Sequence, residues 1–387
     1  MLKVLFIAES AGIGGAEKIT SLMIRYLDRA KFPCEIILGE EGDLVKTYQD
    51  WGIPCTVLKM PRPRPISVQI GRFNIPNPLG ILGSIFSGFG CIYRLSSFLK
   101  QHSFDIIHTS SLLAEIFGSP AWFLSGRKGR LIWHIHNIQP PGFRRWMHTV
   151  MARIFPSRLI CVSEATAEPY RKSQKDIRVI YNAIAPITER STFDIGHELG
   201  IDKNTFIISL VGRICHQKGQ LCLVEASEIL VRQVINVKFI IVGSSSESEP
   251  TAYEKNLREV IQKKGLEKCF VFTGVRNDAA QIIEQSDILV APATGPDTLP
   301  TVISEAMRAG RPVIATNTGG QPEMVEDGKS GFIIEPGRPD ILAEKMKILI
   351  ENPEMRKEMG QRGREIFLEK FTHDRFIKEI ESIYEEQ

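Results

Sequence analysis

The stretch from residue 286 to residue 323 constrains the fold of this chain most strongly. Residues 287–291 form an apolar run of strand length, a loop rich in Pro, Gly and Thr follows, and a helical pattern then ends at Gly310. Residues 313–315 have the character of a second strand. This order predicts a right-handed parallel crossover, because two parallel strands need a connection of this length. The chain is therefore predicted to be an α/β protein that binds its ligands at the carboxyl ends of its strands.

The loop of this crossover, residues 293–299, carries the first candidate functional residues. Asp297 lies in the loop, and Glu305 lies eight positions later on the helix. Pro300 suits a first helical turn because the amide that it lacks has no partner there, and the remaining amides form an anion site. A second turn, residues 318–323, contains two glycines that let the backbone approach a ligand. The alternative is that Asp297 caps a helix and Glu305 is a solvated surface residue.

Length and composition predict an ordinary globular protein of two domains. The 387 residues exceed what one hydrophobic core usually supports, and 43% hydrophobic with 24% charged residues is typical of such proteins. No apolar stretch is long enough to cross a membrane, and residues 1–7 are too short for a signal peptide, so a cytoplasmic location is expected. The seven cysteines are scattered without metal-type spacing, which predicts neither a disulfide framework nor a zinc site.

The net charge of +3 hides an asymmetry between the two halves. Residues 1–185 hold 23 Lys and Arg against 13 Asp and Glu, a balance of +10, and the remainder holds 25 against 32, a balance of −7. A basic half attracts nucleic acid, an anionic membrane surface or an anionic substrate. Nucleic acid is the least favoured of these, because aromatic residues that could stack on bases are few.

The first half opens with a glycine-rich turn. Residues 3–8 have the character of a buried strand and residues 16–28 have helical periodicity, so Gly12, Gly14 and Gly15 lie in a strand-to-helix turn. Bare amides in such a turn can face a phosphate. The dinucleotide fingerprint is not matched, because a glutamate stands where its third glycine would be. A plain tight turn is the alternative.

Three further segments of the first half are candidates for a role in function. Residues 130–136 form a strand that places His136 at its carboxyl end, where a structural histidine is the alternative. Residues 140–158 form a basic amphipathic helix with a Trp, which suits an anionic membrane surface; a solvated helix packed on its own domain is comparably favoured. Residues 79–99 form an apolar helix that could line an acceptor cleft, touch a bilayer or belong to the core. The prolines between residues 61 and 78 exclude regular structure.

The second half begins after a linker at residues 186–201. A strand at residues 205–211 runs into a turn that carries Arg213 and Lys218. A guanidinium fork with a point charge is the combination needed to hold a diphosphate, and a pair of solvated cations is the alternative. Alternating strands and helices then complete a doubly wound sheet, and residues 374–384 form a final amphipathic helix.

Six motifs occur in a fixed order: Gly14-Gly15, His136-Asn137, Tyr181-Asn182, Gly212-Arg213 with Lys218-Gly219, Asp297 to Glu305, and Gly319-Gly320 with Pro322-Glu323. With them the chain resembles the glycosyl transferases of group one, the retaining, metal-independent family four. The resemblance covers nearly the whole length and is strongest over residues 211–336. It implies the GT-B fold of two facing Rossmann-like, doubly wound parallel-sheet domains. An acceptor domain would span residues 1–185, a nucleotide-sugar domain 186–368, and a helix at 369–387 would cross back to the first domain.

The resemblance also implies roles for individual residues. Arg213 and Lys218 would neutralise the departing diphosphate. Glu305 would hold the ribose hydroxyls, Asp297 would contact the transferred sugar, and His136 would lie beside the anomeric carbon. The donor would further be bound by Gly14, Gly15, Gly212, Gly274, Val275, Leu299, Pro300, Thr301 and Val302, and the acceptor side or cleft by Asn137 and Asn182. The family pattern has Glu in place of Asp297, and the shorter side chain alters which sugar hydroxyl it can reach.

The function that the resemblance implies is transfer of a hexose or N-acetylhexosamine from a nucleotide-diphosphate sugar, UDP rather than GDP, to a glycan or lipid-linked acceptor. Such a reaction serves surface polysaccharide or glycoconjugate assembly. No cofactor and no metal are expected, because the two cations and the helix starts neutralise the diphosphate. A peripheral contact with an anionic membrane, at the inner face of the cell membrane, is expected, and no nucleic acid. Two alternatives stay open: a nucleotide-sugar epimerase of the same architecture, which needs no acceptor, and a non-catalytic binding protein for a sugar nucleotide or nucleic acid.

Overall fold

The computed structural model describes residues 1–12, 14–62, 67–70, 73–76, 78–186, 194–246 and 249–386. The chain divides into two compact units. Unit 1 comprises Met1–Ile180 and Phe376–Gln387, and unit 2 comprises Tyr181–Arg375. The divisions therefore fall at 180/181 and 375/376, where the sequence predicts 185/186 and 368/369.

Unit 1 is built on a parallel sheet. Within its described residues the sheet has seven strands in the order β3-β2-β1-β6-β7-β8-β9. The strands are β1 (Val4–Ala8), β2 (Cys34–Leu38), β3 (Cys55–Val57), β6 (Ile106–Thr109), β7 (Arg130–Ile135), β8 (Arg158–Cys161) and β9 (Asp176–Val179). The helices are α1 (Gly15–Tyr26), α2 (Asp43–Asp50), α3 (Pro78–Gln101), α4 (Leu112–Leu124), α5 (Phe143–Ile154), α6 (Glu164–Ala167), η1 (Glu168–Ser173) and most of α15 (His373–Glu385).

The strand order of unit 1 reverses between β1 and β6, which pair with Val4 opposite Ile106. All five residues of β1 are buried, as expected of a parallel strand covered on both faces. One hydrophobic cluster joins α3, α4 and α5 to the same side of the sheet, through Cys91 of α3, Phe117 of α4 and Ala152 of α5. The carboxyl ends of β1 and β6 thus flank the switch point, where doubly wound sheets bind ligands.

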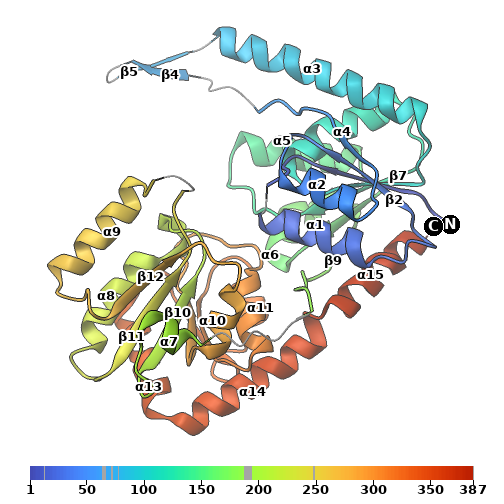
Figure 1. Ribbon diagram of the computed structural model, residues 1–387. Coiled ribbons are helices and arrows are strands. Elements are labelled where there is room, and N and C mark those ends of the chain that lie inside the picture. Colours follow the sequence, from blue (N-terminus) through green and yellow to red (C-terminus); the bar gives the residue numbers. More distant parts are fainter. Residues whose placement is uncertain are drawn as a thin grey trace. The chain divides into compact units, whose positions relative to one another are not determined.

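The C-terminal helix α15 packs into unit 1 (Figure 1). Tyr384 is fully buried, and its hydroxyl lies 2.7 Å from Nδ1 of His108 on β6. The guanidinium of Arg130 donates to the backbone carbonyls of Tyr384 and Glu386. The expectation that the final helix returns to the first domain is therefore confirmed.

The expectation that prolines exclude regular structure from residues 61–78 is wrong in part. Two short strands, β4 (Ser67–Ile70) and β5 (Phe73–Pro76), pair antiparallel within this stretch. Residues 63–66, 71–72 and 77 lie outside the described part of the chain. The ribbon forms because Pro76 stands at the end of its strand, where a missing amide costs little.

Unit 2 contains the second parallel sheet. Its described residues form six strands in the order β12-β11-β10-β13-β14-β15. The strands are β10 (Phe206–Val211), β11 (Val237–Val242), β12 (Phe270–Gly274), β13 (Ile288–Ala291), β14 (Val313–Thr316) and β15 (Gly331–Ile334). The helices are α7 (Ile195–Leu199), η2 (His216–Lys218), α8 (Gln220–Leu230), α9 (Ala252–Lys263), α10 (Ala279–Gln285), α11 (Thr301–Arg308), α12 (Gln321–Met324), α13 (Pro339–Glu351) and α14 (Pro353–Lys370). Residues 195–199 of the expected linker are thus helical, and residues 187–193 lie outside the described residues.

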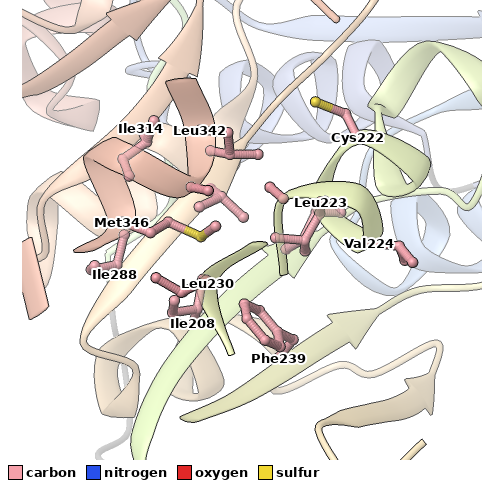
Figure 2. Close-up of a cluster of buried hydrophobic side chains, with 14 of the residues drawn as sticks. Ile208, Cys222, Leu223, Val224, Leu230, Phe239, Ile288, Ile314, Leu342 and Met346 are labelled. Atoms are coloured by element: carbon pink, nitrogen blue, oxygen red, sulfur yellow. The ribbon is translucent and has the colours of Figure 1, made fainter. Parts of the chain in front are cut away.

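In the core of unit 2, helices pack against the central strands of the sheet. Figure 2 shows Leu230 of α8 and Met346 of α13 packed with Ile208 and Ile288, which lie on the neighbouring strands β10 and β13. All four side chains are fully buried, and such burial contributes roughly 1.5–3 kcal/mol for each side chain. The switch point of this sheet lies between β10 and β13, so the loops after these strands are held on a well-packed base.

Candidate functional site

The loops that follow β10 and β13 are in close backbone contact at the carboxyl edge of the unit 2 sheet. Gly219 has φ +74°, and a Cβ there would lie 1.8 Å from the carbonyl oxygen of Pro292, so only glycine allows this approach. The amide of Thr294 donates to the carbonyl of Gln217 at 3.0 Å. These contacts fix the loop that carries the predicted cations against the loop that carries the predicted carboxylate.

Lys218 and Asp297 meet where these two loops join. The ammonium of Lys218 pairs with Oδ2 of Asp297, and their side chains keep 31% and 21% of their surface exposed. The two residues are 79 positions apart in the chain, and the parallel topology brings them together. A partly exposed cation on a fixed loop can exchange its carboxylate partner for a phosphate, because both present anionic oxygens.

A third loop, the glycine turn after β14, holds the backbone of Asp297. The amide of Gly320 donates to the carbonyl of Asp297 at 2.8 Å. Gly319 has φ +59°, and a Cβ there would lie 1.9 Å from the same carbonyl oxygen. The loops after β10, β13 and β14 therefore converge on one residue, Asp297.

Arg213 lies in the same loop as Lys218, but its side chain is exposed. Within the described residues no ion pair is formed by its guanidinium, while its carbonyl accepts a bond from Nε2 of Gln220 at 3.0 Å. Gly212 before it has φ +150° and packs against the aliphatic chain of Lys218, with an added Cβ 3.7 Å from Cδ. The loop thus presents one cation paired with a carboxylate and one cation in solvent.

Helix α11 begins one residue later than the sequence predicts. Pro300 is its N-cap rather than a residue of the first turn, and its ring offers no capping group to the amides that follow. Leu299 and Pro300 are buried, while Thr301 and Val302 are half-buried. The first turn of α11 therefore keeps the polarity that favours an anion.

Glu305, the second predicted carboxylate, lies on helix α11. It borders an open hollow of about 1370 Å³ together with residues of α7, α10 and α11, and none of the residues around that hollow is Arg213, Lys218 or Asp297. Burial lowers the pKa of Arg308, one turn away, and Glu305 opposes that shift. The structure therefore brings Lys218 and Asp297 into contact, and it places Glu305 at the border of this hollow.

The predicted base edge lies at the end of β12. Gly274 has φ +71°, and its carbonyl accepts from the amide of Gly243 at 2.8 Å. A Cβ on Gly243 would lie 2.1 Å from the carbonyl of Gly212. Val275 follows with 76% of its surface exposed, so an apolar side chain stands at this edge without cover from the described residues.

In unit 1, His136 follows directly after β7 and is 93% buried. Its ring centroid lies 4.1 Å from that of His134, as the alternation of the strand predicts. Burial lowers the pKa of His136 to about 3, which keeps the imidazole neutral. Both ring nitrogens are buried, and neither has a hydrogen-bond partner among the described residues.

A buried chain of polar groups stands behind His136. Nε2 of His108 lies 3.1 Å from Nδ1 of His134, and Nδ1 of His108 lies 2.7 Å from the hydroxyl of Tyr384. Burial lowers the pKa of His108 to about 3 as well. His108 and Tyr384 are not among the site residues predicted from the sequence. The position of His108 at the end of a strand is a signal for it, and no residue pattern points to Tyr384.

The turn after β1 carries the carboxylate of Glu17, the residue at the third glycine position of the dinucleotide fingerprint. Gly14 is the N-cap of α1 and Gly15 is its first residue. A Cβ on Gly14 would lie 2.3 Å from Oε2 of Glu17. Burial raises the pKa of Glu17, and hydrogen bonds from the amides of Glu17 and Gly14 oppose that shift. The amide of Gly14, predicted to face a phosphate, thus interacts with the chain's own carboxylate.

The two predicted asparagines lie in different units. Asn137 belongs to unit 1 and is exposed. Asn182 belongs to unit 2 and is 93% buried, and its Oδ1 has no partner among the described residues.

Two further properties bear on the chemistry. In the part of the chain that the structure describes, no three His, Cys, Asp or Glu side chains are grouped so that they could hold a metal ion. Among the same residues, no helix has the length and apolar character needed to cross a membrane.

Comparison with known families gives a match for each half of the chain. Residues 192–366 match the model described as Glycosyl transferases group 1, and residues 13–186 match Glycosyltransferase Family 4. Among solved structures, HepE of Anabaena in complex with UDP-glucose superposes with a TM-score of 0.81 at 26% identity, covering 99% of both chains. The expected two-sheet GT-B fold is confirmed by such neighbours.

Two curated relatives illustrate the range of similarity. The N-acetyl-alpha-D-glucosaminyl L-malate synthase of Bacillus anthracis is 26% identical over 55% of this chain, and the match spans only 54% of that relative's length. The UDP-Gal:alpha-D-GlcNAc-diphosphoundecaprenol alpha-1,3-galactosyltransferase of Escherichia coli is 24% identical over 84% of this chain and 81% of its own.

Proposed function

Because the chain belongs to the glycosyl transferases of group 1, we propose that it moves a hexose or N-acetylhexosamine from a UDP-sugar to a glycan or lipid-linked acceptor. The observation that carries the proposal is the Lys218–Asp297 pair, which three loops at the carboxyl edge of one sheet hold in place. A fixed cation beside a sugar-binding carboxylate is what departure of a nucleoside diphosphate requires. The reaction belongs to surface polysaccharide or glycoconjugate assembly.

In this proposal the donor diphosphate displaces Asp297 from Lys218. Lys218 and the exposed guanidinium of Arg213 then neutralise the negative charge that grows as the bond from the anomeric carbon to the phosphate oxygen breaks. The first turn of α11, around Thr301 and Val302, adds its dipole to the same end. Asp297, once released, is free to accept hydrogen bonds from the transferred sugar.

We propose that the reaction retains the anomeric configuration and needs no metal. The acceptor oxygen attacks from the face that the diphosphate leaves, and the acceptor's proton passes to the departing phosphate oxygen, so no protein nucleophile is required. His136, neutral at physiological pH, hydrogen-bonds an outer hydroxyl of the sugar through a nitrogen that no described protein residue engages. Glu305 holds the ribose after the donor has bound.

UDP is proposed as the donor nucleotide because HepE, at 26% identity, was solved with UDP-glucose. A lipid-linked acceptor is proposed because the relative from Escherichia coli acts on a diphosphoundecaprenol-linked sugar. Together with the +10 balance of residues 1–185, this supports our proposal that the protein works at the inner face of the cell membrane, in peripheral contact with anionic lipid.

The test is a thermal-shift panel of UDP, GDP, ADP and their sugars, followed by mass-resolved transfer assays with and without a chelator. We expect the UDP compounds to raise the melting temperature most, and transfer to persist in the chelator. A chain that interconverts a donor with its epimer in the absence of acceptor would instead be an epimerase. Tight binding of a sugar nucleotide without turnover would indicate a binding protein, and either result would remove the proposal.

A further inference from the structure

One layer of unit 1, formed by α3, α4 and α5, exposes large aromatic side chains. The three helices share one hydrophobic cluster with the sheet, and α4 also packs against α3 (Figure 1). The outward sides carry Phe86, Phe89 and Tyr93 on α3, Phe123 and Leu124 on α4, and Phe143, Trp146 and Ile154 on α5. Single exposed apolar residues are common, but a whole helical layer of them requires an explanation.

Helix α3 has one buried face and one exposed face. Cys91, Leu95 and Leu99 are at most 3% exposed and pack into unit 1. Phe86 and Tyr93 on the other face are 72% and 75% exposed. Seven residues separate them, which is two helical turns, so the exposed rings lie along one stripe.

Helix α5 repeats this arrangement. The sequence predicts an amphipathic helix, and its buried side holds His148 and Ala152. Phe143 and Trp146 are 73% and 61% exposed, and their rings lie 5.6 Å apart. The aromatic residues of this helix therefore point outward, where a helix packed only on its own domain would have polar groups.

The charges on this layer have one sign. Helices α3 and α5 contain no Asp or Glu, and α4 contains one, Glu115, which is 98% buried. Exposed cations stand among the aromatic rings, including Arg94 on α3 and Arg144 and Arg153 on α5. Aromatic rings that enter the headgroup boundary beside cations that pair with phosphate are the chemistry of a helix lying on an anionic bilayer.

We propose that the outward face of α3, α4 and α5 docks unit 1 on an anionic lipid bilayer. The proposal rests on the proposed function, because it supplies the surface from which a lipid-linked acceptor is reached. Helix α5 starts with Phe143, seven residues after His136 at the carboxyl end of β7, so the docking face borders the edge of the sheet where the reaction would take place. The bilayer thus presents the acceptor's headgroup beside that edge.

The test is co-sedimentation of the full chain with vesicles, which needs no donor and no turnover. Vesicles of phosphatidylcholine alone are compared with vesicles in which half of the lipid is phosphatidylglycerol. We expect binding to the anionic vesicles, weakened by salt, and a blue shift in fluorescence that the variant Trp146→Phe loses. R144Q/R153Q should lower affinity about fivefold for each arginine removed, and F86S/F89S at least tenfold.

Matched controls lie in unit 2. Ile235→Ser removes a side chain that is 94% exposed, and K255Q/K263Q removes two exposed cations from α9. These variants should bind vesicles as the unaltered chain does. The proposal would be overturned if the chain bound both vesicle types equally, or if the unit 2 controls lost as much affinity as the unit 1 variants. It would also be overturned if the F86S/F89S variant bound anionic vesicles as tightly as the unaltered chain. Vesicle binding without sugar transfer would instead leave the docking face intact and remove the proposed function.

Discussion

Replacing Gly319 by alanine should disable the site through the backbone of Asp297. The new Cβ would lie 1.9 Å from the carbonyl oxygen of Asp297, and ordinary contact begins at 3.4 Å, so the two loops must separate by about 1.5 Å (3.4 − 1.9). A displacement near 1 Å at a reacting centre costs about a hundredfold in rate. We therefore expect kcat/KM with a UDP-sugar to fall by about a hundredfold or more.

Gly337 provides the matched control for this substitution. Its φ of +71° resembles the +59° of Gly319, but an added Cβ meets nothing within 4 Å. Both variants should lose about 1 kcal/mol of unfolding free energy from the left-handed backbone, and Gly319→Ala about 1–3 kcal/mol more from the clash. The assays are urea unfolding, steady-state turnover and thermal shift by UDP.

The reasoning is refuted if Gly319→Ala turns over within about threefold of Gly337→Ala. It would also fail if both variants lost turnover equally, because the loss would then come from backbone strain and not from the position of Asp297. The UDP thermal shift serves where the acceptor is not yet identified, since a displaced loop should weaken nucleotide binding in Gly319→Ala alone.

Three further outcomes are expected. Lys218→Met should lower kcat about a hundredfold to a thousandfold in single-turnover assays while the protein stays folded, because it removes a donor from the departing diphosphate; unchanged kcat would exclude the residue from the reaction. Burial holds the pKa of His108 and His136 near 3, below about 6.5 in the unfolded chain, so the unfolded chain takes up protons first as the pH falls. The stability from these histidines is complete above pH 6.5 and is lost progressively towards pH 3, by up to about 1.4 kcal/mol per unit for each, which urea unfolding at several pH values measures. Glu115→Ala should cost about 3–5 kcal/mol in the same assay, because the 2.6 Å contact from Glu115 to Nε2 of His148 is fully buried; a loss below 1 kcal/mol would contradict this.

The sequence could predict the contact between residues that the parallel order of the strands brings together. Parallel strands place the loops after β10 and β13 at one edge, so Lys218 and Asp297 could be expected to lie close together although 79 positions separate them. Hydrophobic periodicity likewise placed most strands and helices, because buried parallel strands are short apolar runs.

Side-chain direction and long-range pairing could not be predicted in the same way. The sequence shows that α5 is basic and amphipathic, but not that Phe143 and Trp146 lie on its outer side, because His148 takes the buried place in a bond to Glu115 on another helix. The ribbon of β4 and β5 is not predicted from the number of prolines in this stretch. What matters is that Pro76 stands at the end of its strand. The contact of Glu17 with Gly14 depends on a rotamer that no residue pattern specifies.

The return of α15 to unit 1 sets the order in which the newly made protein can mature. Residues 181–375 are contiguous and emerge from the ribosome as a complete unit, whereas the sheet of residues 1–180 lacks its last helix until residues 376–387 follow. Before these residues are made, His108 lacks its hydrogen-bond partner, the hydroxyl of Tyr384, which lies 276 positions further along the chain. A chain that ends at residue 375 would therefore contain every residue of the second unit but would leave the first unit without its last helix, exposed to chaperones and proteases.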